Sequence, residues 1–143
     1  MPVATETDVI GAMVAHVRTL ASVIDKTAMR ISATRKKSWN LPAYAVLIQG
    51  PFGGAGDIGA GLIEERVDFW AYGPNELTSK VLAARLAFEL FRPDLNGPPP
   101  FVAAGTRVTD IRSAGGRIYI VDPDEDWQYT VVQSVIRYSG VPV

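Results

Sequence analysis

Residues 50–61, GPFGGAGDIGAG, have the residue types and spacing of a phosphate-binding loop. Gly54, Gly56 and Gly59 form a literal G-x-G-x-x-G directly after an apolar run, as in dinucleotide-binding folds. In those folds a helix follows at once, because the pyrophosphate binds at the N-terminus of that helix. Here an alternating, strand-like run follows, and the only charged residue of the segment is Asp57, which repels phosphate. We therefore expect a flexible loop between two strands instead of a nucleotide site.

The length and composition of this loop favour a contact with another protein. Its twelve residues exceed the roughly two to five of a common hairpin connection, and its many glycines give it many backbone states. Phe52 and Ile58 are apolar side chains that a loop facing only water would not need. We predict a loop that becomes ordered on a partner. The expected contact residues are Phe52, Gly53, Gly54, Asp57 and Ile58.

The acidic segment 122–133, DPDEDWQYTVVQ, is superficially similar to a calcium-binding loop. Asp122, Asp124 and Asp126 take the first, third and fifth positions of an EF-hand. The sixth position needs glycine but is Trp127, and the twelfth needs a bidentate glutamate but is Gln133. The sequence therefore favours a solvated acidic turn over a calcium site.

The remaining reactive residues form no catalytic pattern. The chain has no cysteine and a single histidine, His16, which lies in a helical run and is expected at the surface or its boundary. Glu64 and Glu65 are neighbours on a strand, so their carboxylates point to opposite faces and cannot form an acid–base pair. Glu65 falls on the apolar face, where an arginine would neutralise it. We expect no enzymatic activity, cofactor or metal.

Hydrophobic periodicity predicts the elements that position these residues. A helix is expected over 5–25, with a capping box at Thr5 and Asp8, and a second helix over 75–91. Strands are expected over 43–50 and 62–72, on either side of the glycine-rich loop. The residues expected in the core are Val67 and Phe69 on the alternating strand, and Leu77, Val81, Phe88 and Phe91 on the second helix.

The last third of the chain is strand-like. Runs at 101–112 and 117–122 are separated by SAGG, a hairpin signal, and a long strand follows at 127–140. The order of elements predicts one α+β domain over residues 1–143, with a mainly antiparallel sheet and two helices packed on one face. The chain has a net charge of -1, which does not favour binding of nucleic acid through bulk charge. It has no run of about 18 apolar residues and no secretion signal, so we expect neither membrane insertion nor secretion.

This organisation resembles the tail terminator, or tail-completion, proteins of long-tailed bacteriophages and related phage-like particles. The resemblance rests on the order of four stretches and spans nearly the whole chain. Where the family often has a small residue and an alanine soon after the turn, this chain has PNELTSK. The four stretches are TDVIGAMVAHV, PAYAVLIQG with its glycine-rich loop, ERVDFWAYGPNELTSKVLAARLAFEL, and VDPDEDWQYTVVQSVIRY.

The resemblance implies a structural virion protein, assembled in the host cytoplasm and located at the neck of the tail. Such proteins form a homohexameric ring that caps the tail tube, ends its polymerisation and docks to the head–tail connector or head-completion protein. DNA would pass through the channel without specific binding, and the near-zero net charge is compatible with that passage. The alternatives are another neck or tail-tube ring subunit, or a small nucleotide-binding enzyme that uses residues 50–61.

Within such a ring, the two unusual segments take specific roles. The loop at 50–61 would contact a neighbouring ring, either the last tube ring or the connector. The acidic turn would line the channel or its rim, where negative charge discourages DNA from binding. The residues expected there are Asp122, Asp124, Glu125 and Asp126.

Overall fold

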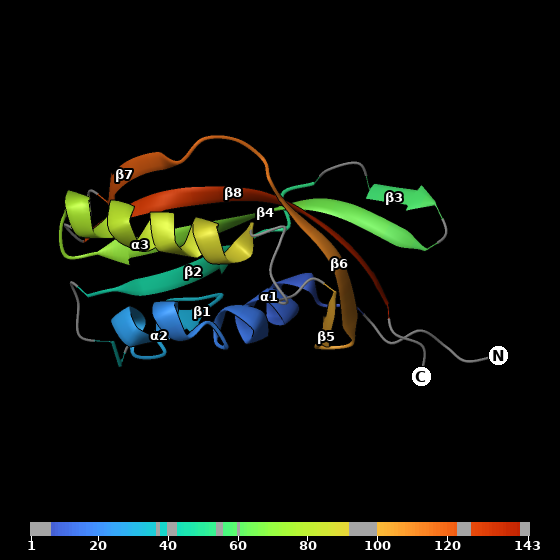
Figure 1. Cartoon of the computed structure of the whole chain (residues 1–143), viewed down its shortest axis with the longest axis horizontal. Coiled ribbons are helices and arrows are strands. Elements are labelled where there is room, and N and C mark those ends of the chain that lie inside the picture. The colour runs from blue at the N-terminus through green and yellow to red at the C-terminus, as the bar shows by residue number, and fades with distance from the viewer. Residues whose placement is uncertain are drawn as a thin grey trace.

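Two long strands, β4 and β8, form the middle of the sheet in the computed structural model of this chain (Figure 1). They pair antiparallel over eleven positions, from Ile63 opposite Tyr138 to Gly73 opposite Gln128. The structure describes residues 7–36, 38–39, 43–53, 56–59, 61–91, 100–122 and 127–140. Within this part the strands are β1 (Ile31–Ser32), β2 (Ala45–Gln49), β3 (Gly56–Gly59), β4 (Leu62–Gly73), β5 (Phe101–Ala103), β6 (Thr106–Ser113), β7 (Ile118–Asp122) and β8 (Trp127–Gly140).

The other strands are arranged on either side of this pair. On the β4 side, β2 and β3 pair with successive parts of β4, and β1 runs parallel to β2 at the edge. On the β8 side, β6 and β7 pair with successive parts of β8, and β5 extends the sheet beyond β6. All pairs except β1 with β2 are antiparallel, so the predicted α+β class with a mainly antiparallel sheet is confirmed.

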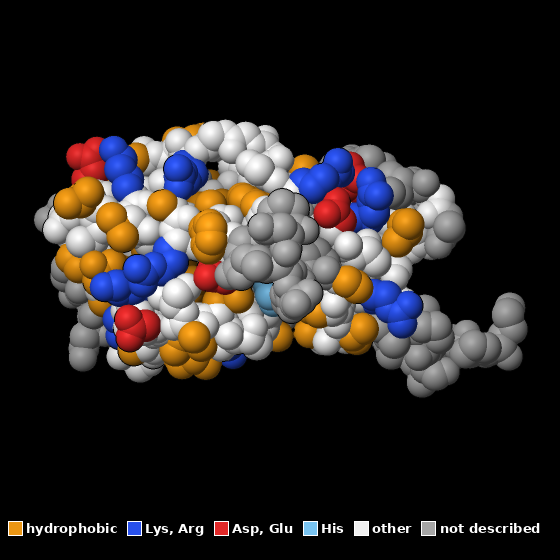
Figure 2. Space-filling model, in the orientation of Figure 1, with side chains coloured by type: hydrophobic (Ala, Val, Ile, Leu, Met, Phe, Trp, Pro, Cys, Tyr) orange, Lys and Arg blue, Asp and Glu red, His pale blue; other side chains and the backbone are white. Residues whose placement is uncertain are grey.

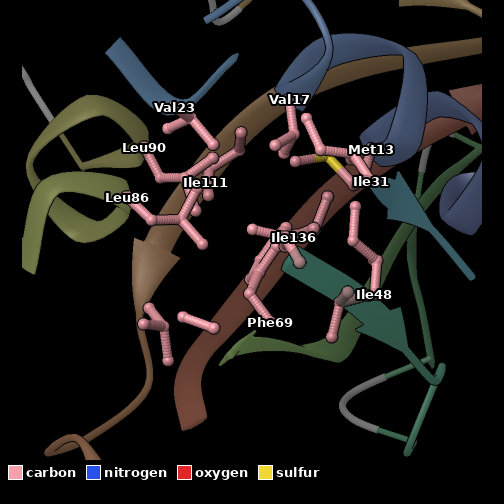
Figure 3. Close-up of a cluster of buried hydrophobic side chains, with 14 of the residues drawn as sticks. Met13, Val17, Val23, Ile31, Ile48, Phe69, Leu86, Leu90, Ile111 and Ile136 are labelled. Carbon is pink, nitrogen blue, oxygen red and sulfur yellow. The ribbon is translucent and has the colours of Figure 1, made fainter. Parts of the chain in front are cut away.

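Three helices cover one face of the sheet: α1 (Val9–Val17), α2 (Ala21–Thr27) and α3 (Glu76–Leu90). Figure 3 shows how their apolar side chains meet those of the strands, with Leu86 and Leu90 of α3 directed toward Ile111. Val67 and Phe69 of β4 are fully buried in this cluster, as the alternation predicts. Burial of this face accounts for most of the hydrophobic stabilisation of the fold.

Two helices, α1 and α2, form where the sequence predicted a single helix over 5–25. The Asp8 carboxylate caps α1 by accepting the backbone N–H of Gly11 at 2.8 Å, whereas Thr5 lies outside the described residues. The chain then leaves the helix, and the Arg18 guanidinium donates to the Ile31 carbonyl at 2.7 Å, which holds this corner against β1. Leu20 is extended before α2 begins, so α1 and α2 are separate helices.

The hairpin predicted at SAGG is wrong. β6 and β7 do not pair with each other, because β8 is fourteen residues long and accommodates both, one after the other, along one side. Ser113 lies opposite Ser134 and Ile118 opposite Val131, so the intervening residues bulge out as the chain steps along β8. The hairpin instead lies between β5 and β6, where Ala103 pairs with Thr106.

The second helix forms where predicted, but it is rotated relative to the expected core face. Leu77, Val81 and Phe88 were predicted to be buried, yet they are 70%, 46% and 63% exposed. Phe91, just after the helix, is only partly buried and packs against the core. The residues of α3 that are buried are Ser79, Leu82, Ala83, Leu86 and Leu90.

Three polar and steric contacts select this rotation. The Ser79 hydroxyl lies 3.0 Å from the Thr130 hydroxyl on β8, and both groups are buried. Gly73 brings the end of β4 so close that a Cβ there would lie 2.6 Å from the Ser79 nitrogen. The Asn75 side chain and Thr78 form a capping box that fixes the start of the helix. These contacts place the Ser79 side of α3 on the sheet, so the Leu77 stripe faces outward.

This rotation predicts opposite stability effects for two nearby substitutions on α3. Leu86→Ala should lower the free energy of unfolding by about 2–5 kcal/mol, because it leaves a cavity under a fully buried side chain. Phe88→Ala should change it by no more than about 1 kcal/mol, because most of that ring is exposed. Urea denaturation of the two variants at protein concentrations where the chain is monomeric measures both values. A larger loss for Phe88→Ala than for Leu86→Ala would contradict the rotation.

Candidate assembly surfaces

The backbone of the glycine-rich segment is held against β4. The Phe52 N–H donates to the Arg66 carbonyl at 2.8 Å, and the Arg66 N–H donates back to the Gly53 carbonyl at 2.6 Å. Further along, β3 pairs with the first residues of β4. The segment predicted to be a flexible loop between two strands therefore contains a strand of its own, β3, and its described part is fixed to β4. β4 extends beyond the end of β2, and the segment satisfies backbone groups that β2 does not reach.

Only part of the predicted contact surface can be placed. Phe52 is 55% exposed, and Gly53 beside it is also exposed. Gly54 lies outside the described residues, and so do the side chains of Asp57 and Ile58, although their backbone belongs to β3. The structure therefore presents an aromatic side chain on a backbone fixed to the sheet, which is a more preorganised contact than a free loop.

The acidic turn lies mostly outside the described part of the chain. Asp124, Glu125 and Asp126 are not described, and for Asp122 only the backbone is described, as the last residue of β7. Asp122 pairs with Trp127, the first residue of β8. The segment between these two residues therefore joins neighbouring antiparallel strands, as the predicted turn requires.

His16 is buried instead of lying at the surface. Its ring stacks on Phe101 with centroids 4.4 Å apart, and its Nε2 atom has no hydrogen-bond partner among the described residues. Burial lowers the pKa of His16, and the negative charge of Glu89 partly opposes that effect. A neutral ring in this position packs α1 against β5.

Glu65 points into the helix-covered side of the sheet, as the strand alternation predicts, but its partner is not an arginine. Its carboxylate accepts a hydrogen bond from the hydroxyl of Tyr138, and the Glu65 Oε2 atom has no partner among the described residues. Burial, together with this carboxylate, raises the pKa of the Tyr138 hydroxyl above its ordinary range. The pair ties β4 to β8 by a hydrogen bond that keeps the tyrosine protonated.

Charged residues on the opposite face of the sheet are paired with one another. The Glu64 carboxylate accepts from Arg112 at 2.9 Å and from Arg137 at 3.1 Å, which links β4, β6 and β8. Arg66 forms an ion pair with Asp68 at 3.1 Å. Arg112 also forms an ion pair with Asp110 at 3.0 Å, so three arginines face three carboxylates in this cluster and its charges balance. These pairs are partly exposed, so each contributes little to stability. The arrangement suits a surface without a strong field more than a charged ligand site.

The outward face of α3 is an apolar stripe that the sequence analysis assigned to the core. Leu77, Val81, Ala84 and Phe88 are exposed and follow one another at intervals of four, three and four residues. Figure 2 shows hydrophobic side chains at the surface over α3, on the left of the view. We call these four residues the α3 seam. The sequence pattern could have indicated this exposed stripe, because α3 carries two overlapping apolar stripes and only one can face the sheet.

A shallow groove borders the α3 seam on the side of α2. Val81, Ala84 and Phe88 line it from α3, and the Arg85 guanidinium crosses it to donate to the Ser22 carbonyl at 3.2 Å. The groove is open to solvent and contains both signs of charge, with Asp25 on α2 and both Arg85 and Glu89 on α3. Its shape and lining suit protein contact more than capture of a small molecule, which needs an enclosed site.

The face of the sheet away from the helices carries a second, smaller core, in which Tyr72 and Trp127 are buried and Trp39 packs against them. Trp70 stacks on Tyr129 with centroids 4.9 Å apart, and both rings are half-buried. Beside them at the sheet edge, Ile118 and Ile120 of β7 are 48% and 36% exposed. They share this face because they pair with Val131 and Tyr129 on β8. We call Trp70, Tyr129, Ile118 and Ile120 the open sheet face.

No family model and no curated protein matches this chain. Among the described residues, no group of three or more His, Cys, Asp or Glu side chains is placed to hold a metal ion. Over the same part of the chain, no helix has both the length and the apolar character needed to cross a membrane. Three surfaces with exposed apolar side chains are the candidate functional features of the described residues: the Phe52 segment, the α3 seam and the open sheet face.

The buried His16 predicts a pH dependence of stability. Its pKa in the folded state lies below the ordinary value of 6.5, so the unfolded chain binds this proton more readily. The contribution of the neutral ring is fully present above about pH 6.5 and is lost progressively as the pH falls below it. Urea denaturation between pH 5 and 8 should show this loss. His16→Gln, which cannot titrate, should remove that part of the slope, and an unchanged slope would contradict the assignment.

Proposed function

We propose that this chain is a structural subunit of a ring that caps a bacteriophage tail tube, ends its polymerisation and joins the tail to the head. The observation that carries the proposal is the α3 seam, where Leu77 and Phe88 are mostly exposed in a helix that is otherwise well packed. Contiguous exposed apolar surface of this kind marks a site of protein–protein contact. The order of the sequence motifs, which resembles that of tail terminator proteins, supplies the kind of assembly.

The other described features support an assembly role. The His16 ring is engaged in packing on Phe101, and the Glu65 carboxylate accepts a hydrogen bond from Tyr138, whose raised pKa keeps its hydroxyl protonated. On the side of the sheet away from the helices, Glu64, Asp68 and Asp110 form ion pairs with Arg66, Arg112 and Arg137. A surface with balanced charge favours passage of DNA through a ring, because unpaired basic side chains would bind the DNA phosphates.

Of the alternatives, another neck or tail-tube ring subunit would use the same kinds of surface. A nucleotide-binding enzyme receives less support. The glycines of residues 50–61 continue into β3 and then β4, and no helix begins at this segment to present its N-terminus to a pyrophosphate. The glycine spacing therefore serves a turn between strands in this chain.

A native mass spectrum tests the ring directly. We expect the purified protein to give a species of six times the chain mass, and negative-stain images to show closed rings with a central channel. Added to a phage tail-tube protein that polymerises in vitro, taken from the same genome, the rings should shorten the tubes and sit at one end. A protein that remains monomeric at all concentrations, or that leaves tube length unchanged, would contradict the proposal.

The exposed Phe52 predicts a separable defect in joining to a neighbouring ring. Phe52→Asp should leave the melting temperature within a few degrees of the wild type, because the side chain is mostly in solvent and the Arg66 backbone bonds remain. The ring should still form, but binding to tube ends should weaken at least tenfold. Val102→Asp changes an equally exposed apolar residue on β5 and serves as the control. Equal binding by both variants would show that Phe52 is not part of the contact.

A further inference from the structure

We propose that the outer edge of β7 pairs with β7 of a second copy of this chain, antiparallel and about a two-fold axis at Tyr119. The pairing joins the two sheets into one through main-chain hydrogen bonds. It goes beyond the proposed function, because a symmetric contact joins copies two by two, whereas a ring is closed by a head-to-tail contact. Either proposal can therefore fail without the other.

β7 is paired on one side only in the part of the chain that the structure describes. It pairs with β8 from Ile118 opposite Val131 to Asp122 opposite Trp127, and no described strand pairs with its other side. Figure 1 shows β7 at the upper border of the sheet. In such a strand, alternate residues direct their N–H and C=O groups away from the neighbouring strand, so these groups can pair with a further strand.

Other edges of the sheet carry features that prevent pairing between molecules, whereas β7 does not. β1 and β5 have only two and three residues, and β3 contains a register shift. β6 has a register shift after Val108 and carries Asp110 and Arg112 beyond it. Short strands, bulges and charged side chains are the usual protection of an edge. Residues 118–121 of β7, Ile-Tyr-Ile-Val, pair with β8 without a bulge and contain neither a charge nor a proline.

Three apolar side chains of β7 are exposed beside this edge. Ile118, Ile120 and Val121 are 48%, 36% and 48% exposed. The Lys80 amine on α3 lies 5.2 Å from the Tyr119 ring centroid, so Tyr119 is on the helix side of the sheet and the two isoleucines are on the opposite side. A strand from a second copy would extend both faces of the sheet beside these residues and remove part of their apolar surface from water.

The apolar residues also select the register of the pair. Residues that lie opposite each other in an antiparallel pair share a face of the sheet. With Tyr119 opposite its own counterpart, each Ile118 lies opposite an Ile120 of the second copy. A shift by two residues would place Ile118 opposite Asp122, or Ile120 opposite Gly116, depending on its direction. The register centred on Tyr119 is therefore the one that pairs the isoleucines with each other.

The order of charges along the chain favours a second copy in the antiparallel direction. Arg117 directly precedes β7, is exposed and has no ion pair with another described residue. Asp122 is the last residue of β7. The proposed register places Asp122 of one copy one position from Arg117 of the other at both ends, whereas parallel pairing would bring like charges together. On the helix side, Lys80 beside the edge is balanced by Glu76 at 2.9 Å.

The contact is small, and its affinity comes mainly from the backbone. Strands that add to the edge of a sheet bind through main-chain hydrogen bonds, and alternate side chains supply the specificity. A strand of five residues buries less than the roughly 800 Å² per partner of a stable interface. We therefore expect a reversible dimer whose population rises with protein concentration.

Cysteine trapping measures the pairing and its register, because the chain has no cysteine of its own. Tyr119→Cys alone should give a disulfide-linked dimer and no larger product under mild oxidation, because position 119 lies opposite its counterpart. Val102→Cys, at an exposed apolar residue of β5, is the control and should give at least tenfold less dimer. Equal yields from the two variants would overturn the inference. A higher yield from Ile120→Cys than from Tyr119→Cys would overturn the proposed register.

Further substitutions in the Tyr119→Cys protein test the edge and its charges. Ile120→Lys should lower the dimer yield at least tenfold with circular dichroism and melting temperature unchanged, whereas Val102→Lys should leave the yield unchanged. Arg117→Glu and Asp122→Arg should each lower the yield, and the two together should restore it, because opposite charges meet again. An unchanged yield in Ile120→Lys, or a charge-swapped double variant no better than either single one, would overturn the inference.

The mass of the assembled protein distinguishes this inference from the proposed function. A Tyr119→Cys protein that gives the covalent dimer but no species of six times the chain mass would support the β7 contact and contradict the ring. A six-fold species without the covalent dimer would contradict the β7 contact and leave the ring in place.

Discussion

The antiparallel pairing of β4 with β8 is the constraint on which the rest of the structure depends. Eleven consecutive positions pair without a bulge, so the alternation of one strand fixes that of the other over most of their length. Because these strands are longer than any partner, each carries two shorter strands in succession along its outer edge. One end of this strand pair extends beyond the helices, as the right side of Figure 1 shows for β4. At this end β4 pairs with β3, which belongs to the glycine-rich segment.

The same pairing decides which face of α3 is exposed. Thr130 of β8 lies under the helix and forms a hydrogen bond with Ser79, while Gly73 at the end of β4 allows the backbone to approach closely. A buried hydroxyl pair of this kind is costly to leave unsatisfied, so the helix cannot rotate to bury Leu77 and Phe88 without losing it. The α3 seam is thus a consequence of a polar contact in the core, and the outer stripe remains available for assembly.

Burial of polar groups in this protein serves packing. His16 between α1 and β5, and Glu65 beside Tyr138, occupy positions that an apolar residue would fill in a simpler core. Both lie on the side of the sheet that the helices cover, whereas the aromatic and ion-paired residues are on the other side. The two sides therefore differ in chemistry, which gives the subunit two unlike surfaces, as directional assembly requires.

The sequence by itself determined the class of the fold, the strands at 43–50, 62–72 and 127–140, and the helix near 75–91, because local periodicity is read within one element. It also placed Val67, Phe69 and Glu65 on one side of β4. The tertiary structure decided the split of the first helix, the placement of β6 and β7 along β8, and the burial of His16. It also decided the rotation of α3, since two apolar stripes satisfy the same period. The Ser79–Thr130 contact, formed between residues far apart in the chain, and the close approach at Gly73 distinguish them.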